Sequence, residues 1–228
     1  MSFSERTEII YGSDAMQRIR DSRVCVFGLG GVGATAAMDL VRAGVESLWV
    51  FDFDTVCESN LNRLYFGYRS VIGMQKTEAF RRFALDINPA ASIHSIEDIV
   101  RGAEAHERIP QGCDVYLDCI DSLNPKVNLM AALARGGYRF ASSMGTSGRI
   151  APERLKLGSL WKSSGCPLAQ KVRQRLGRLG LGPGKETQCD ISCVWSDEEP
   201  APTALPADGS IPGSTINGAR VRAVLGSS

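Results

Sequence analysis

The apolar positions in the first 150 residues predict strands that alternate with helices. Strands are predicted where apolar, β-branched and aromatic residues run together: Arg23–Phe27, Leu48–Phe51, Asp114–Ile120 and Tyr138–Ala141. Helices are predicted in the intervening segments: Ala34–Arg42, Gly73–Leu85 and a segment that begins near Asn124. This alternation is typical of an α/β fold, and we expect a Rossmann-like, doubly wound, mostly parallel sheet.

The pattern changes in the last third of the chain. Cys189–Cys193 has the pattern of a strand that places both thiols on one face. A loop is predicted over Ala201–Pro212, which is rich in proline and small residues, and a short helix over Thr215–Leu225. We therefore divide the chain into a core, residues 1–150, and a C-terminal α+β extension, residues 151–228.

A glycine-rich turn joins the first predicted strand to the first predicted helix. It reads Gly28-Leu29-Gly30-Gly31-Val32-Gly33, and its strand–turn–helix context is typical of a nucleotide site. Gly28 permits a tight turn, Gly30 lets a phosphate approach the backbone, and Gly33 lets helix and strand pack closely. Together with Gly31, these residues place phosphates at the positive end of the helix.

Acidic residues follow the second predicted strand. Asp52 comes about 20 residues after the glycines, a spacing that suits the hydroxyl groups of a ribose. Asp54 follows it, and we assign both residues to nucleotide binding. The glycines and Asp52 alone fit NAD and ATP equally.

Two basic residues and a further carboxylate favour ATP. Arg63 binds phosphate oxygens in a fork, and Lys76 supplies a second, point-like charge. Asp121 follows the predicted strand Asp114–Ile120 at the carboxyl edge of the sheet, where a carboxylate can hold Mg²⁺ that bridges phosphates. Simpler interpretations stay open: Arg63 and Lys76 as solvated surface charges, and Asp121 as the cap of the next helix.

The net charge of +1 hides a strong asymmetry. Residues 1–125 hold 12 Lys/Arg and 18 Asp/Glu, whereas residues 126–185 hold 12 Lys/Arg and one acid. The basic segment indicates a polyanionic partner, and we expect tRNA held through its phosphates. Its densest part is a predicted helix with an apolar stripe of Leu168, Val172 and Leu176, and the tRNA-binding residues proposed on it are Lys171, Arg173, Arg175 and Arg178. An ordinary solvated helix face is the alternative.

The seven cysteines and the N-terminus bear on the compartment. Cys25 and Cys119 lie in predicted core strands, which favours reduced thiols over disulfides. There is no apolar run long enough to span a membrane and no signal-peptide pattern, so we expect a cytoplasmic protein. Paired C-x-x-C motifs for zinc are absent from the sequence. Cys166 precedes Pro167 at a predicted helix start, as either a reactive thiol or a plain small residue.

Five motifs resemble the ubiquitin-activating-enzyme-like adenylyltransferase superfamily: GLGGVG, DFDTV, SNLNR, Gly73–Lys76 and Leu117–Asp121. The resemblance implies an enzyme that uses Mg·ATP to convert a carboxylate into an acyl-adenylate. It also implies that Asp52 binds the ribose, that Asn60, Arg63 and Lys76 contact the phosphates, and that Asp121 holds Mg²⁺. Arg63, Lys76 and Asp121 are thereby assigned catalytic roles. Many members have Gln after the Asn-Arg pair, where this chain has Leu64.

The second half resembles the tRNA threonylcarbamoyladenosine dehydratases within that superfamily. The resemblance rests on Ser142–Gly148, on Ser164-Gly165-Cys166-Pro167-Leu168-Ala169 and on Cys193–Pro200. It implies activation of the threonylcarbamoyl carboxylate by ATP, ring closure by the modification's own carbamoyl group, and net loss of water. It further implies a homodimer.

Other functions remain open. An adenylyltransferase could activate the C-terminus of a ubiquitin-like sulfur-carrier protein and relay sulfur through Cys166, with a cysteine desulfurase as a partner. A catalytically silent nucleotide-sensing or tRNA-binding scaffold is a second alternative. A plain NAD oxidoreductase is disfavoured because no proton donor is evident in the cleft, and His94 and His106 are expected at the surface.

Overall fold

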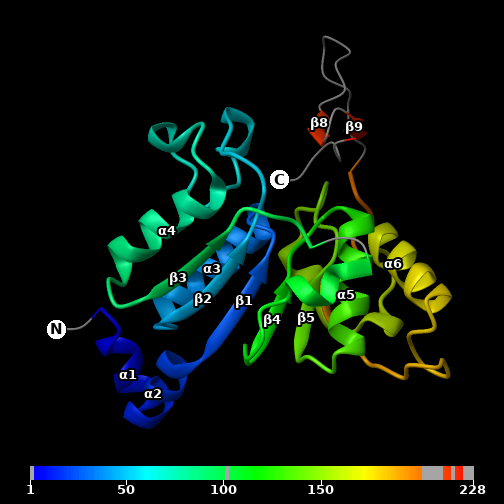
Figure 1. Ribbon diagram of the computed structural model, residues 1–228, viewed down its shortest axis with the longest axis horizontal. Coiled ribbons are helices and arrows are strands. Elements are labelled where there is room, and N and C mark those ends of the chain that lie inside the picture. Colours follow the sequence, from blue (N-terminus) through cyan, green and yellow to red (C-terminus); the bar gives the residue numbers. More distant parts are fainter. Residues whose placement is uncertain (1–2, 101–102, 202–212, 217–218, 223–228) are drawn as a thin grey trace.

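The computed structural model describes residues 3–100, 103–201, 213–216 and 219–222. Its centre is a seven-stranded sheet in the order β3-β2-β1-β4-β5-β7-β6 (Figure 1). Neighbouring strands are parallel, except that β6 runs antiparallel to β7. The strands are β1 (Arg23–Phe27), β2 (Ser47–Phe51), β3 (Ser92–Ile96), β4 (Val115–Asp118), β5 (Phe140–Ser143), β6 (Leu155–Ser159) and β7 (Ser192–Ser196).

Helices cover both faces of this sheet. The α-helices are α1 (Glu5–Tyr11), α2 (Ser13–Asp21), α3 (Gly31–Ala43), α4 (Lys76–Ile87), α5 (Leu123–Arg135) and α6 (Pro167–Arg178). Short 3₁₀ helices lie at Glu58–Asn60, Arg69–Val71, Ala103–Arg108, Pro152–Arg154 and Leu160–Lys162. None of the helices in the described part of the chain is long and apolar enough to cross a membrane.

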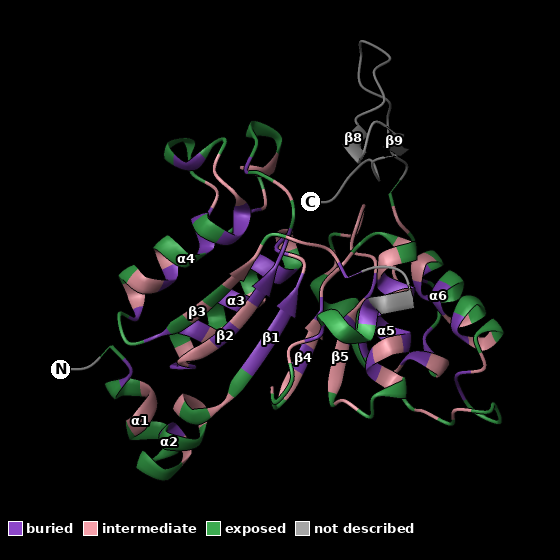
Figure 2. Cartoon of the chain, in the orientation of Figure 1, coloured by how far each residue is buried: buried purple, intermediate pink, exposed green. Residues whose placement is uncertain are grey.

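Side-chain alternation along the strands divides the core. Val24 and Val26 of β1 pack with α3 and α4 on one face, whereas Cys25 and Phe27 pack with α5 on the other. A third cluster joins α5 and α6 to Cys193 on β7. Buried positions concentrate along the strands and on the inner sides of the helices (Figure 2). The expected α/β, doubly wound, mostly parallel architecture is confirmed, and the segment after residue 150 continues the same sheet.

Several predicted boundaries differ from the structure. The helix predicted from Gly73 begins at Lys76, because Gly73 has a φ of +87° and Thr55 forms a β-bridge with Gln75. The predicted strand Asp114–Ile120 is shorter at both ends in the structure, where it is β4. Strand β5 begins two residues later than predicted. β3, with the sequence Ser-Ile-His-Ser-Ile, was not among the predicted strands. Its polar residues weaken the pattern of a buried strand.

Two predictions in the last third of the chain are wrong: the helix at Thr215–Leu225 and the strand that was to place Cys189 and Cys193 on one face. The segment predicted as a helix at Thr215–Leu225 contains two antiparallel strands, β8 (Gly213–Ile216) and β9 (Ala219–Arg222). Its β-branched residues favour strands, and the sequence between them, Asn217-Gly218, is a strong hairpin signal. The predicted loop over Ala201–Pro212 lies outside the described residues apart from Ala201.

Cys189 lies outside β7, which begins at Ser192. Contrary to the prediction, the thiols of Cys189 and Cys193 therefore do not lie on one face of a strand. The physical reason is that the carbonyl of Cys189 accepts a hydrogen bond from Nε1 of Trp161 at 2.8 Å and leaves the ladder. Cys193 does lie in β7, opposite Ser142 of β5.

Candidate active site

The glycine turn between β1 and α3 is fixed by backbone contacts that allow no side chain at two positions. Gly28 has a φ of +89°, and its N–H donates to the carbonyl of Phe51 at 2.8 Å. A Cβ on Gly33 would lie 1.8 Å from the carbonyl oxygen of Gly28. Helix α3 therefore packs directly on the turn, as the spacing of the glycines predicts.

Gly30 lies at the open side of the same turn. It is the N-cap residue of α3, it has no side-chain capping bond, and a Cβ built on it meets no atom within 4 Å. The first N–H groups of a helix have no partner within the helix, and the helix dipole is positive there. This end of α3 therefore fits a phosphate group.

Asp52 links the end of β2 to the glycine turn. Its Oδ2 accepts a hydrogen bond from the N–H of Leu29 at 2.7 Å, and its Oδ1 accepts one from the N–H of Asp54 at 2.9 Å. Burial raises the pKa of Asp52 above its usual value, although Lys76 opposes the shift. The carboxylate therefore lies beside the turn, and its role in binding a ribose stays a prediction.

Lys76 is the first residue of α4 and is nearly buried beside two carboxylates. Its Nζ lies 2.9 Å from Oδ2 of Asp54 and 3.5 Å from Oδ1 of Asp52. Burial alone would lower the pKa of Lys76, but the carboxylates of Asp52 and Asp54 outweigh burial and raise it. Lys76 is thus an ion-paired cation and not the solvated surface charge of the simpler interpretation.

Arg63 lies over the start of α3. A Cβ on Gly31 would lie 3.4–3.5 Å from the Cβ, Cγ and Cδ atoms of Arg63, so the stem of the arginine covers that glycine. Its guanidinium donates to the carbonyl of Ser59 at 2.9 Å and to Oδ1 of Asn62 at 3.1 Å. The stem of Arg63 therefore lies beside the first residue of α3, whereas its guanidinium bonds to residues of its own turn.

Asn60 shapes the turn that carries Arg63. Its Oδ1 accepts a hydrogen bond from the N–H of Cys57 at 3.3 Å, and its carbonyl accepts bonds from the N–H groups of Arg63 and Leu64. Leu64, which stands where the resemblance leads us to expect Gln, is buried in the core. No polar contact from this position is available to a phosphate.

Asp121 follows β4 at the same edge of the sheet as the glycine turn. β4 runs parallel to β1 with Asp118 opposite Phe27, so the segments that follow the two strands are neighbours. The N-cap residue of α5 is Ser122, which excludes Asp121 as that cap. The Asp121 carboxylate is exposed, and a carboxylate with phosphate oxygens is a donor set that Mg²⁺ accepts. The residues present thus fit the ion, although no cluster of three candidate ligands occurs among the described residues.

A buried polar network behind Asp121 was missed by the sequence interpretation. Lys126 of α5 pairs with Asp118 of β4 at 2.8 Å, and Oγ of Ser142 donates to the same carboxylate at 2.6 Å. One signal was available: Lys126 shares a helical stripe with the apolar residues Met130 and Leu133. A lysine on an apolar stripe predicts a buried carboxylate partner.

The four predicted tRNA-binding residues of the basic helix α6 differ in their contacts with the rest of the protein. Lys171 and Arg178 are exposed. Arg173 turns toward its own domain, where Nη1 donates to the carbonyl of Ser163 at 2.8 Å. Arg175 donates to Oδ1 of Asn124 at the start of α5. On the opposite side of α6, Val172 and Leu176 are buried and Leu168 packs against the same core cluster, as the apolar stripe predicts.

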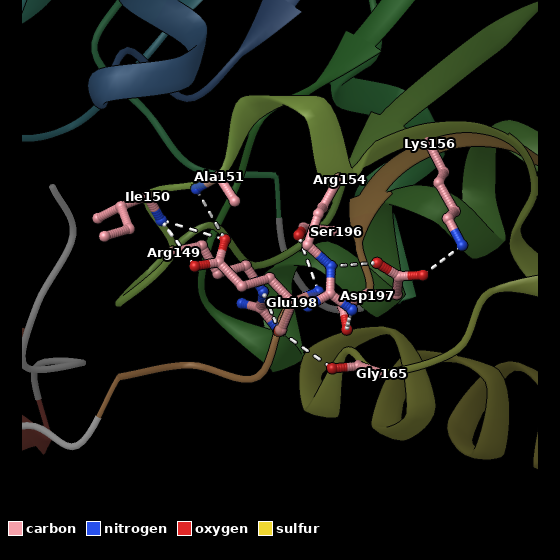
Figure 3. Close-up of polar contacts among 9 residues, drawn as sticks. All are labelled: Arg149, Ile150, Ala151, Arg154, Lys156, Gly165, Ser196, Asp197 and Glu198. Atoms are coloured by element: carbon pink, nitrogen blue, oxygen red, sulfur yellow. Dashed lines mark hydrogen bonds and ion pairs between the residues drawn. The ribbon is translucent and has the colours of Figure 1, made fainter.

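The loop after β5 and the end of β7 are joined by a second polar cluster, which we call the Arg149–Glu198 clasp (Figure 3). Arg149 donates to the carbonyls of Gly145, Gly165 and Glu198 at 2.9, 3.2 and 3.1 Å. The Glu198 carboxylate accepts hydrogen bonds from the N–H groups of Ile150 and Ala151. These backbone bonds lower the pKa of Glu198.

Asp197 extends the clasp through side-chain pairs. Arg154 lies 3.0 Å from its carboxylate, and Lys156 bonds to the second oxygen. Hydrogen bonds from Lys156 and Arg154 lower the pKa of Asp197. The clasp therefore fixes the small-residue loop after β5 against the start of α6.

Cys166 is 4% exposed and packs in the cluster between α5 and α6. It is the N-cap residue of α6, immediately before Pro167, as the simpler interpretation expects. All seven cysteines of the chain are unpaired.

The chain is similar to several known proteins. Residues 4–154 match the ThiF family. The tRNA threonylcarbamoyladenosine dehydratase of Escherichia coli (strain K12) is 32% identical over 193 residues, which are 84% of this chain and 72% of that protein. The molybdopterin-synthase adenylyltransferase of the same organism is 36% identical over 118 residues, which are 52% of this chain and 47% of that protein.

A solved structure extends the likeness to three dimensions. The crystal structure of the Escherichia coli dehydratase in complex with ATP matches with a TM-score of 0.81 and 31% identity, over 86% of this chain and 81% of that chain. The sequence match to the family covers the glycine turn, Arg63, Lys76 and Asp121. This chain belongs to the ThiF family.

Proposed function

We propose that this chain catalyses the ATP-dependent dehydration of threonylcarbamoyladenosine in tRNA, which closes that modification into its cyclic form. The observation that carries the proposal is the likeness to dehydratases over most of the chain, beyond the nucleotide-binding half. The adenylyltransferase relative matches only about half of the chain. The Arg149–Glu198 clasp and α6 lie in the part that the dehydratases share.

In this proposal, the first 125 residues bind and orient ATP. Asp52 accepts hydrogen bonds from the ribose, and the N–H groups at the start of α3 bind the phosphates. Arg63 and Lys76 neutralise phosphate charge, which favours attack at the α-phosphorus. Mg²⁺, held through Asp121, would neutralise further charge on the phosphate oxygens.

The reaction balances without a protein nucleophile. A carboxylate oxygen of the threonylcarbamoyl group attacks the α-phosphorus of ATP, and pyrophosphate leaves with the electrons of the broken P–O bond. The carbamoyl group then attacks the activated carbonyl carbon, the ring closes, and AMP leaves with the former carboxylate oxygen. One proton is released from the attacking group. The burial of Cys166 is consistent with a mechanism that needs no thiol.

The partner in this proposal is tRNA, and its binding surface includes α6. Residues 126–185 carry 12 basic residues and one acid, and Lys171 and Arg178 are exposed there. Such a surface favours contacts with phosphates, which fix position without reading sequence. Arg173 and Arg175 bond to neutral groups within the protein and so keep their positive charges, which add to the positive potential of this surface.

A homodimer in the cytoplasm completes the proposal. Ile9 and Ile10 of α1 are 78% and 75% exposed, and apolar surface of this kind is what subunit interfaces cover. The unpaired cysteines suit a reducing compartment. Sedimentation at several protein concentrations would measure the mass, and a monomer throughout would contradict the dimer. Cell fractionation would test the compartment.

The decisive experiment supplies tRNA that carries threonylcarbamoyladenosine, together with ATP and Mg²⁺. We expect the modified nucleoside to lose the mass of one water in mass spectrometry, with AMP and pyrophosphate formed in equal amounts. Arg63→Ala is the matched control, because it removes a phosphate contact and leaves the fold intact. No mass loss with the natural chain would contradict the proposal.

The second candidate acts on a sulfur-carrier protein. The matching adenylyltransferase favours it, and the buried position of Cys166 disfavours a sulfur relay through that thiol. ATP–pyrophosphate exchange that depends on a carrier protein or a cysteine desulfurase, and not on tRNA, would support this candidate over the dehydratase.

A further inference from the structure

A buried ion pair contacts the backbone that leads into Asp121. Nζ of Lys126 and Oδ2 of Asp118 are 2.8 Å apart, and both side chains are fully buried. Removing two charges from water is costly, and an apolar pair of similar size often stabilises a fold equally well. Stability alone is therefore a weak explanation for this pair.

Both members of the pair also bind the backbone of Ile120. Oδ1 of Asp118 accepts a hydrogen bond from the N–H of Ile120 at 3.1 Å. Nζ of Lys126 donates to the carbonyl of Ile120 at 2.8 Å. The two peptide groups that flank Ile120 are thus held from two elements, β4 and α5, and the second of these groups leads into Asp121.

The same segment is in contact with the glycine turn. A Cβ on Gly28 would lie 3.1 Å from the carbonyl oxygen of Cys119 and 3.3 Å from the nitrogen of Ile120. The N–H of Cys119 donates to the carbonyl of Phe27 at 2.8 Å. A displacement of Ile120 would therefore change the position of Asp121 relative to the phosphate-binding end of α3.

We propose that Asp118 and Lys126 are positioning residues, which hold Ile120 so that the Asp121 carboxylate is directed at the divalent ion accompanying ATP. This inference rests on the proposed function, because it assumes a nucleotide with its ion at this edge of the sheet. The pair acts on the ion only through the backbone before Asp121. Loss of such an outer partner typically weakens metal binding about 10- to 100-fold.

The test measures Mn²⁺ binding by electron paramagnetic resonance in the presence of a non-hydrolysable ATP analogue. Lys126→Met should raise the half-saturating Mn²⁺ concentration about tenfold or more. Binding of the same analogue without a divalent ion should be unchanged. The double variant Asp118→Asn/Lys126→Met leaves no lone buried charge, and it provides the same readout if the single variant fails to fold.

Leu176→Ala is the control for loss of stability alone. Leu176 is a buried residue of α6 in the cluster between α5 and α6, whereas Ile120 packs against a different cluster, so this variant should weaken folding and leave Mn²⁺ affinity unchanged. Normal Mn²⁺ affinity in the Lys126 variants, or an equal loss in Leu176→Ala, would overturn the positioning role alone. If the natural chain itself binds neither analogue nor ion, the proposed function fails and this inference with it.

Discussion

At the scale of single residues, the glycines of the turn have different roles. Gly33 has no room for a side chain because the carbonyl of Gly28 lies where its Cβ would be. Gly30 has ample room in the structure, and its φ of −77° suits any residue. Folding therefore requires a glycine at 33, whereas ligand approach is the remaining reason for one at 30.

Two alanine variants separate the role in folding from the role in ATP binding. Gly33→Ala should lose about 1–3 kcal/mol or more of folding free energy through the clash with Gly28. Gly30→Ala should unfold at nearly the natural temperature and bind ATP more weakly, because its methyl group occupies the approach of a phosphate. Thermal unfolding and ATP titration measure both effects. Full ATP affinity in Gly30→Ala would show that no phosphate approaches at this position.

At the scale of elements, α6 combines an apolar stripe with a basic outer face. Two arginines of the helix bond within the protein: Arg173 to the carbonyl of Ser163 in the segment before the helix, and Arg175 to Asn124 at the start of α5. Helical spacing identified the apolar stripe correctly, but it does not show which arginines form hydrogen bonds within the protein. Those bonds depend on acceptor groups of residues ten or more positions away in the sequence.

Salt dependence of tRNA binding tests this division of the basic residues. If Lys171 and Arg178 each neutralise one phosphate, replacing both with Gln should reduce the slope of log affinity against log salt by about 1.5. Arg173→Gln should lower the unfolding temperature and change the slope little. An unchanged slope in the double variant would remove α6 from the tRNA surface.

The clasp between β7 and the loop after β5 predicts a response to acid. The pKa values of Asp197 and Glu198 are lowered, so these ionised groups stabilise the fold above their ordinary pKa values, near 4. That contribution is lost as the pH falls through the lowered values. The unfolding temperature should therefore fall between about pH 5 and pH 3, and less steeply in Glu198→Gln. Parallel profiles for the two proteins would contradict a role for Glu198.

At the scale of the whole molecule, the sheet continues across the predicted boundary at residue 150. β7 pairs with β5, and the cluster around Cys193 includes side chains of α5. The first 150 residues alone would thus expose the edge of β5 and one side of α5. The nucleotide half and the basic half share one core.

A chain that ends at residue 150 tests this interpretation. We expect it to lack a cooperative thermal transition and to bind ATP poorly, because the cluster between α5 and α6 is lost. Calorimetry of the shortened chain beside the full chain measures the difference. A cooperative transition in the shortened chain would show that the first 150 residues fold as a separate domain.

The sequence predicted the fold well where patterns are local. The glycine turn, Asp52 and the strands around them follow short-range rules of backbone geometry, and β1 begins and ends as predicted. The pairing of Lys76 with two carboxylates, the network at Asp118 and the clasp at Arg149 were not predicted. These contacts join different elements of the fold, and residue spacing does not show which elements will be neighbours, although the apolar stripe of α5 does indicate a buried partner for Lys126.

The order of the strands gives the opposite charges of the two halves a spatial meaning. The acidic first 125 residues build β1 to β4, and the basic residues 126–185 build β5, β6 and α6, with β5 on the other side of β4. The excess of acidic residues therefore lies on the side of β2 and β3, and the excess of basic residues lies on the side of β5 and α6. A diffusing polyanion would experience a torque that turns the basic flank toward it before contact. Orientation would thus begin in solution, with the reactive carboxylate arriving from the flank opposite to β2 and β3.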